Sequence, residues 1–156
     1  MAVTIRRQER GYLLECEQRL PAPRDEVFPF FAEAGNLETI TPPHLRFRIV
    51  TPLPIRMEEG ALIDYRLTLR GLPLRWRSEI TAWAPPERFT DEQRRGPYRF
   101  WIHEHIFEED GDGTLVKDRV RYDVPGGAMV NRVFVAGDLR RIFRFRARKL
   151  ETIFPG

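Results

Sequence analysis

Extended segments separated by tight-turn residues, and followed by one amphipathic tail, constrain the fold more than any other feature. The clearest turn is Asp110-Gly-Asp-Gly113, which joins the alternating segments 98–108 and 114–124. Asp-Gly turns between such segments are typical of β-hairpins, and strands joined by tight turns pair antiparallel. The other segments predicted to be strands are 11–20, 45–50, 61–69, 74–84 and 87–94.

The helical segments fall at two places. Residues 26–32 form a short apolar helix in which Pro29 is early enough to be tolerated, and residues 36–40 form another turn. The tail, 131–154, carries apolar residues at three- and four-residue spacing, which predicts one long helix with an apolar stripe. The stripe consists of Val133, Ala136, Phe143, Ala147, Leu150 and Phe154.

The fold class follows from this order of one strand, two short helices, six strands and a long helix. An antiparallel sheet must bury one face, and the tail helix has nothing else against which to bury its stripe. We therefore predict an α+β fold in which a curved seven-stranded antiparallel sheet wraps around the tail helix. A length of 156 residues with 42% hydrophobic residues fits a single domain over 1–156.

Composition argues against a membrane-spanning segment, a secretory signal and an internal disulfide. No apolar run approaches the about 18 residues that span a bilayer, and residues 1–10 lack the apolar segment of a secretory signal. The single cysteine, Cys16, excludes an internal disulfide, so we expect a cytoplasmic protein with Cys16 as a buried apolar residue.

A basic run marks the tail, although the net charge is only +3. Such a run can bind nucleic acid or anionic lipid, but it is more typical of the solvated face of a helix. Because no nucleic-acid motif accompanies it, we expect no nucleic-acid partner; peripheral lipid contact and the oligomeric state stay open. The run is Arg140, Arg141, Arg144, Arg146, Arg148 and Lys149.

Register around the Asp110–Gly113 turn predicts which side chains face the helix. Pairing Glu109 with Thr114 sets His105 opposite Asp118, and alternation then places every second residue on that face. The opposite face pairs Glu104 with Arg119, so we expect that face to be exposed to solvent. The inward residues of this hairpin include Trp101, His103, His105, Phe107, Val116, Asp118, Val120 and Tyr122.

The neighbouring hairpins extend the same face. Placing Arg94 opposite Tyr98, and Arg70 opposite Pro73, turns a further set of side chains inward. The predicted pairs are Phe89 with His103, Asp91 with Trp101, Leu67 with Trp76, Tyr65 with Ser78, and Ile63 with Ile80, and Gln93 joins this face.

Several motifs together resemble a known group. They are the Trp76 strand, residues 85–93 (PPERFTDEQ), residues 96–107 (GPYRFWIHEHIF), and Gly113-Thr114 followed by Asp118, Val120 and Tyr122. They are similar to a small bacterial ligand-binding branch of the SRPBCC, or START-related, superfamily. The resemblance implies the helix-grip fold of birch-pollen-type allergens, lipid-transfer START domains, coenzyme Q-binding proteins and polyketide cyclases. It carries over no catalytic residue.

The inward face predicts the binding of a small hydrophobic or aromatic ligand, of lipid, isoprenoid or polyketide type, in a cavity between sheet and helix. Apolar walls with few polar groups are typical of such sites. No cofactor is expected. The predicted ligand-binding residues are Tyr65, Trp76, Ser78, Phe89, Asp91, Gln93, Trp101, His103, His105, Phe107, Asp118, Tyr122 and Phe143.

Other interpretations of the polar residues remain open. A cyclase or dehydratase would use His103 or His105 with Asp118 or Asp91 for acid–base chemistry. A purely structural network would have Asp118 accept a hydrogen bond from His105, with Asp91 and Gln93 capping neighbouring groups. His103, His105 and Asp118 are residue types that can together bind a metal ion. Because a His-x-His motif alone is a weak signal for a metal site, we expect no metal. A third class is an interaction protein that uses the basic helix.

Overall fold

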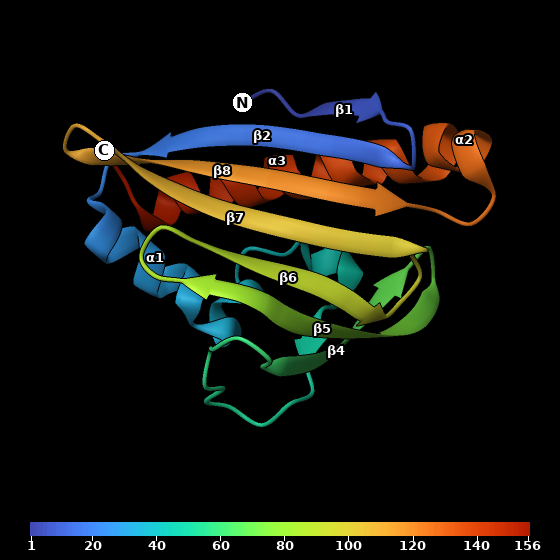
Figure 1. Ribbon diagram of the computed structural model, residues 1–156, viewed down its shortest axis with the longest axis horizontal. Helices are drawn as coiled ribbons and strands as arrows, with labels where there is room; N and C mark the ends of the chain where they lie inside the picture. Colours follow the sequence, from blue (N-terminus) through green and yellow to red (C-terminus); the bar gives the residue numbers. More distant parts are fainter.

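The structure is a computed structural model that describes residues 1–156, and one antiparallel sheet of eight strands dominates it (Figure 1). The spatial order is β1-β2-β8-β7-β6-β5-β4-β3, so the sheet is open and β1 and β3 are its edges. The strands are β1 (Thr4–Arg7), β2 (Tyr12–Leu20), β3 (Arg48–Ile49), β4 (Leu62–Leu69), β5 (Leu72–Ala84), β6 (Arg88–Arg95), β7 (Phe100–Asp110) and β8 (Gly113–Asp123).

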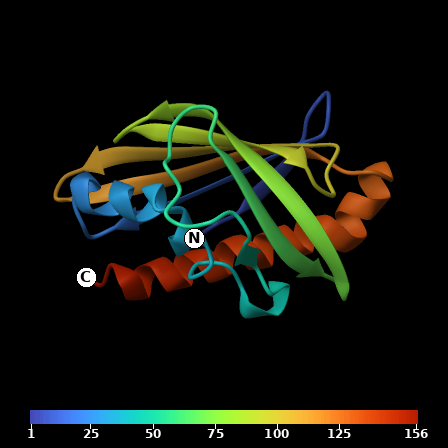
Figure 2. The ribbon, with the colours of Figure 1, turned by 90° about the horizontal axis from the view of Figure 1, so that it is seen from below.

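A long helix lies along the concave face of the sheet. In Figure 2 the sheet arches over α3 (Ala136–Ile153), and the β4–β5 hairpin curls down towards the helix. Helix begins earlier, with α2 (Gly127–Val130) and a π-helical turn, η3 (Asn131–Val135). The remaining helices are α1 (Arg24–Ala32) and the 3-10 turns η1 (Ala34–Leu37) and η2 (Pro43–Leu45). None of the helices is long and apolar enough to cross a membrane.

The predicted α+β class is confirmed, with eight strands in place of the expected seven. The additional strand, β1, pairs with β2 through its backbone while its side chains stay largely exposed, so it lacks the apolar alternation that marks the other strands. The segment expected to be extended over 45–50 is shorter, because Pro43 starts a 3-10 turn and only Arg48 and Ile49 pair with β4.

Register is confirmed for one hairpin and corrected for two. The β7–β8 pairs are as predicted, including His105 with Asp118 and Trp101 with Tyr122. The other two hairpins are displaced by two residues, which keeps each side chain on its predicted face but changes its neighbours. Thus Asp91 pairs with His103, Phe89 with His105, Tyr65 with Trp76, and Ile63 with Ser78.

Turn geometry explains both displacements. Arg70 and Gly71 both have positive φ, of 50° and 79°, and form a two-residue turn that pairs Leu69 with Leu72. Arginine seldom adopts that conformation, so the sequence favours a turn one residue later. Between β6 and β7 the side chain of Gln93 hydrogen bonds to both the backbone N–H and the carbonyl of Tyr98, which holds a wider loop.

The apolar core is divided into two clusters, one around α1 and one around the N-terminal half of α3. Four residues of the predicted stripe behave as expected, since Ala136, Phe143, Ala147 and Leu150 are buried. Val133 is 56% exposed, which contradicts its predicted burial, because the π-helical turn around it shifts the helix face that meets the sheet.

Candidate functional site

Two adjoining pockets lie between the concave face of the sheet and α3. The first has a volume of about 70 Å³ and lies beside α1, and the second has a volume of about 170 Å³ and lies beneath β4 and β5. An apolar cavity of about 150 Å³ is large enough to hold benzene, so the second pocket has room for a ring-sized molecule. Both are lined by Leu37, Ile40, Tyr65, Asp91, His105 and Arg146.

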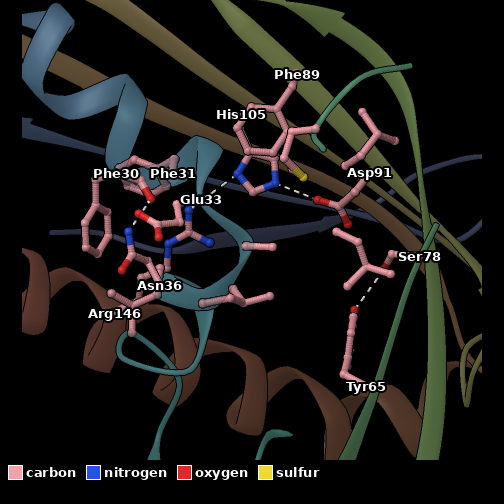
Figure 3. Close-up of a pocket in the computed structure, with 16 residues that line it drawn as sticks. Phe30, Phe31, Glu33, Asn36, Tyr65, Ser78, Phe89, Asp91, His105 and Arg146 are labelled. Carbon is pink, nitrogen blue, oxygen red and sulfur yellow. Dashed lines mark hydrogen bonds and ion pairs between the residues drawn. The ribbon is translucent and has the colours of Figure 1, made fainter. Parts of the chain in front are cut away.

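The walls of the pockets are mainly apolar. The first pocket, shown in Figure 3, is lined by Phe30 and Phe31 of α1 and by Phe89 of β6. The second is lined by more aromatic residues, which come from the sheet, the β6–β7 loop, the loop after η2 and α3. These are Phe47, Tyr65, Trp76, Tyr98, Trp101 and Phe143.

A hydroxyl pair lies on the sheet side of the pockets. Ser78 Oγ accepts a hydrogen bond from Trp76 Nε1 at 3.0 Å and lies 2.9 Å from the Tyr65 hydroxyl. Burial holds the pKa of Tyr65 well above its ordinary value, so the hydroxyl keeps its proton. When Ser78 donates to Tyr65, the Tyr65 proton is free for a molecule in either pocket.

The first of two carboxylate–histidine pairs joins β6 to β7. His105 Nε2 lies 2.6 Å from Asp91 Oδ2, and its ring stacks on Phe89 at a centroid distance of 4.2 Å. Burial, reinforced by the neighbouring His103, lowers the pKa of His105 to about 4, so the imidazole is neutral at pH 7. Burial opposes ionisation of Asp91, yet the hydrogen bond from His105 holds the pKa of this carboxyl below its ordinary value.

The second pair is the more enclosed. His103 Nε2 lies 2.7 Å from Asp118 Oδ1, and Nη2 of Arg146 lies 3.3 Å from the same oxygen. Burial alone would raise the pKa of Asp118, but the Arg146 charge and the His103 hydrogen bond hold it far below its ordinary value. The predicted partner of Asp118 was His105; its Nδ1 lies 3.8 Å away, because the side chain of Asp118 reaches across to the neighbouring histidine.

Arg146 corrects the prediction that the basic run is wholly solvated. Its side chain is 9% exposed, it spans from α3 to the sheet, and Nη2 also approaches His105 Nδ1 at 3.5 Å (Figure 3). The guanidinium lies over the rings of Phe31 and Phe143, and its Nε has no hydrogen-bond partner. The sequence does indicate this burial, because Arg146 follows Phe143 by three residues and so lies on the buried face of the helix.

The structure places most of the predicted site residues around these pockets. Tyr65, Asp91 and His105 line both; Ser78 and Phe89 line the first; Trp76, Trp101, His103 and Phe143 line the second. Four do not line either one. Gln93 holds the β6–β7 loop, Asp118 lies behind His103, Phe107 packs against α1, and Tyr122 donates a hydrogen bond to Asn131 Oδ1 at 2.7 Å.

Chemically, the site combines aromatic walls with a polar cluster. Asp91, His103, His105 and Arg146 of this cluster line the pockets, Asp118 lies behind His103, and the two imidazole rings stack at a centroid distance of 3.7 Å. Both nitrogens of His105 are engaged, Nε2 by Asp91 and Nδ1 by Arg146. Of the two carboxylates, only Asp91 lines the pockets, so it is the one that a bound molecule can reach.

An antiparallel sheet wrapped around a long C-terminal helix, with pockets between them, defines a helix-grip protein. The chain belongs to the family described as "Polyketide cyclase / dehydrase and lipid transport", whose profile matches residues 14–154. This confirms the resemblance to the SRPBCC superfamily that the sequence motifs indicated. No curated relative matches the chain by sequence.

Solved structures share the fold at low sequence identity. A protein from Mycobacterium smegmatis has a TM-score of 0.71 at 17% identity, with 97% of each chain covered. One from Chromobacterium violaceum has a TM-score of 0.72 at 12% identity, covering 92% of this chain and 97% of that one. The major latex-like protein 151 of Panax ginseng has a TM-score of 0.68 at 14% identity, with the same coverage.

Proposed function

We propose that the chain binds a small hydrophobic or aromatic ligand, of lipid, isoprenoid or polyketide type, between the sheet and α3. The observation that carries this proposal is the second pocket, which has mainly aromatic and aliphatic walls and few polar groups. Apolar walls supply the free energy of burial, and a few fixed polar groups orient the ligand. The family description, which names both lipid transport and polyketide cyclisation, supports the same class of ligand.

Two measurements test this function. Native mass spectrometry of the chain purified from its own host is expected to show a bound small molecule. Leu67→Trp, which fills the second pocket from β4, is expected to abolish binding of that molecule in a tryptophan-fluorescence titration. The matched control is Leu62→Trp, because Leu62 lies on the opposite face of the same strand and is 45% exposed. Equal affinities of the two variants would place the ligand outside the pocket.

A second candidate is a cyclase or dehydratase, and the exposure of Asp91 to both pockets favours it. With both nitrogens of His105 occupied, Asp91 is the group best placed to accept a proton from a ligand, and His105 holds its carboxylate in position. Asp91→Asn is expected to stop conversion of the co-purified molecule, followed by mass spectrometry, without abolishing its binding. Glu92→Gln is the control, and conversion that survives Asp91→Asn excludes this candidate.

A further inference from the structure

The strand register corrects the interpretation of the two histidines. On the predicted register Asp91 pairs with Trp101, whereas in the structure it pairs with His103 and lies next to His105. Asp91 Oδ2 is 2.6 Å from His105 Nε2 and 4.0 Å from His103 Nδ1. One potential ligand atom from each of the three residues falls within 4.8 Å of the others. This set differs from the one that the sequence suggested, in which Asp118 was the carboxylate.

We propose that Asp91, His103 and His105 bind a divalent transition-metal ion of the Zn²⁺, Co²⁺ or Fe²⁺ type at the wall of the second pocket. Two imidazoles and one carboxylate are ligands that these ions accept, whereas Mg²⁺ and Ca²⁺ prefer oxygen. Metal–ligand bonds of about 2.0–2.2 Å place neighbouring ligand atoms about 3 Å apart. Because each imidazole binds an ion in its own ring plane, the two rings, now stacked at 3.7 Å with an interplanar angle of 22°, must rotate out of their stack when the ion binds. All three residues line the second pocket, so the open coordination positions face it.

The surrounding residues fit this assignment. His103 Nε2 is held by Asp118 at 2.7 Å, so Nδ1, which lies 4.0 Å from Asp91 Oδ2, is the ring nitrogen left to bind the ion. A carboxylate behind a metal-binding histidine is the usual second layer of such sites. Arg146 lies 3.3 Å from Asp118 and neutralises the second-layer carboxylate, but its Nη2 also lies 3.5 Å from His105 Nδ1 and must move away when the ion binds.

Binding requires one rearrangement of protons. His105 now donates from Nε2 to Asp91, and its Nδ1 accepts from Arg146. When Nε2 binds the ion, the ring proton moves to Nδ1, and Asp118 Oδ1, 3.8 Å away, becomes its acceptor as Arg146 withdraws from Nδ1. The ion thus takes the place of the proton between His105 Nε2 and Asp91.

The test is a titration of Co²⁺ into the chelator-treated full chain, followed by visible absorption, with Zn²⁺ as competitor. We expect one equivalent to bind. Asp91→Asn, His103→Ala and His105→Ala should each weaken binding by more than about 100-fold, and Asp118→Asn by about 10-fold, which is the lower end of second-layer effects. His44→Ala is the matched control, since His44 is exposed and is the only other histidine.

A second measurement does not depend on the variants folding. Nitrogen-15 spectra of the histidine rings of the unsubstituted chain should show Zn²⁺ shifting Nε2 of His105 and Nδ1 of His103, with His44 unchanged. Absence of one-equivalent binding, binding that survives all three ligand substitutions, or a shift only at His44 would overturn the proposal. Because neither experiment contains an organic ligand, the result is independent of the proposed function.

Discussion

The Asp118 side and the Asp91 side of the polar cluster are built from the same residue types but differ in how completely they are enclosed. The Asp118 side chain is 9% exposed and has three partners, His103, Arg146 and the thiol of Cys16 at 3.8 Å. The Asp91 side chain is 18% exposed, hydrogen bonds only to His105 and lines both pockets. A buried carboxylate with several partners stabilises the fold, whereas one facing a pocket is available to a ligand.

The largest expected effect on stability comes from removing the charge of Asp118 and, separately, that of Asp91. Asp118→Asn leaves the Arg146 guanidinium buried without its anion, so we expect a loss of about 3 kcal/mol in the free energy of unfolding. Asp91→Asn retains an acceptor for His105 and should cost about 1 kcal/mol. Urea unfolding measures both. Asp112→Asn, at a fully exposed side chain in the β7–β8 turn, is the control. Equal losses at Asp118 and Asp91 would remove the distinction between the two sides.

A smaller effect is expected from pH. His105 has a pKa of about 4 in the folded chain against about 6.5 unfolded, so the unfolded state binds more protons between these values and stability rises with pH. The contribution is complete above pH 6.5 and is lost as pH falls towards 4; we expect about 2 kcal/mol between pH 7.5 and 4.5. The lowered pKa values of Asp91 and Asp118 extend the loss below pH 4.

The same urea experiment at several pH values, in metal-free buffer, checks this expectation. His105→Gln should flatten the dependence between pH 6.5 and 4, whereas the control His44→Gln should leave it unchanged. If the free energy of unfolding depends as steeply on pH in His105→Gln as in the unsubstituted chain, groups other than His105 cause the dependence.

The smallest effect concerns the thiol behind Asp118. Burial, together with the adjacent Asp118 charge, raises the pKa of Cys16, so its thiolate is scarce at neutral pH. Labelling by a disulfide reagent at pH 8 should be at least about 100-fold slower in the folded chain than in urea. In Asp118→Asn the folded-state rate should increase, because one cause of the raised pKa is gone. An equal rate in folded and unfolded chain would show that this side of the cluster is open.

The sequence was sufficient where a turn determined its own geometry. The Asp110–Gly113 hairpin predicted every pair of β7 and β8, and with them the inward direction of His103, His105 and Asp118. Side-chain alternation tolerates a displacement of two, so Tyr65, Ser78 and Asp91 were also placed on the correct face.

What sequence could not supply were contacts between elements distant along the chain. Arg70 holds its left-handed conformation with its guanidinium 5.0 Å from the Phe134 ring and 3.2 Å from Asp138, both in the C-terminal helical region. In the sequence Arg146 is one of several basic residues in a run, and only the packing of α3 against the sheet shows that its side chain is buried. Both contacts depend on the docking of the C-terminal helices, which neither local propensity nor periodicity reveals. The pairing of Asp91 with His103 follows instead from the wider β6–β7 loop that the Gln93 side chain holds.

The open sheet has a consequence for association. A sheet that curls around a helix without closing into a barrel keeps two free edges, and unpaired edges invite pairing with another chain. Here the edges are β1, four residues with arginine at positions 6 and 7, and β3, two residues beginning with Arg48. Short edges that carry positive charge repel a second copy of themselves, so the sheet can stay open without exposing a template for aggregation.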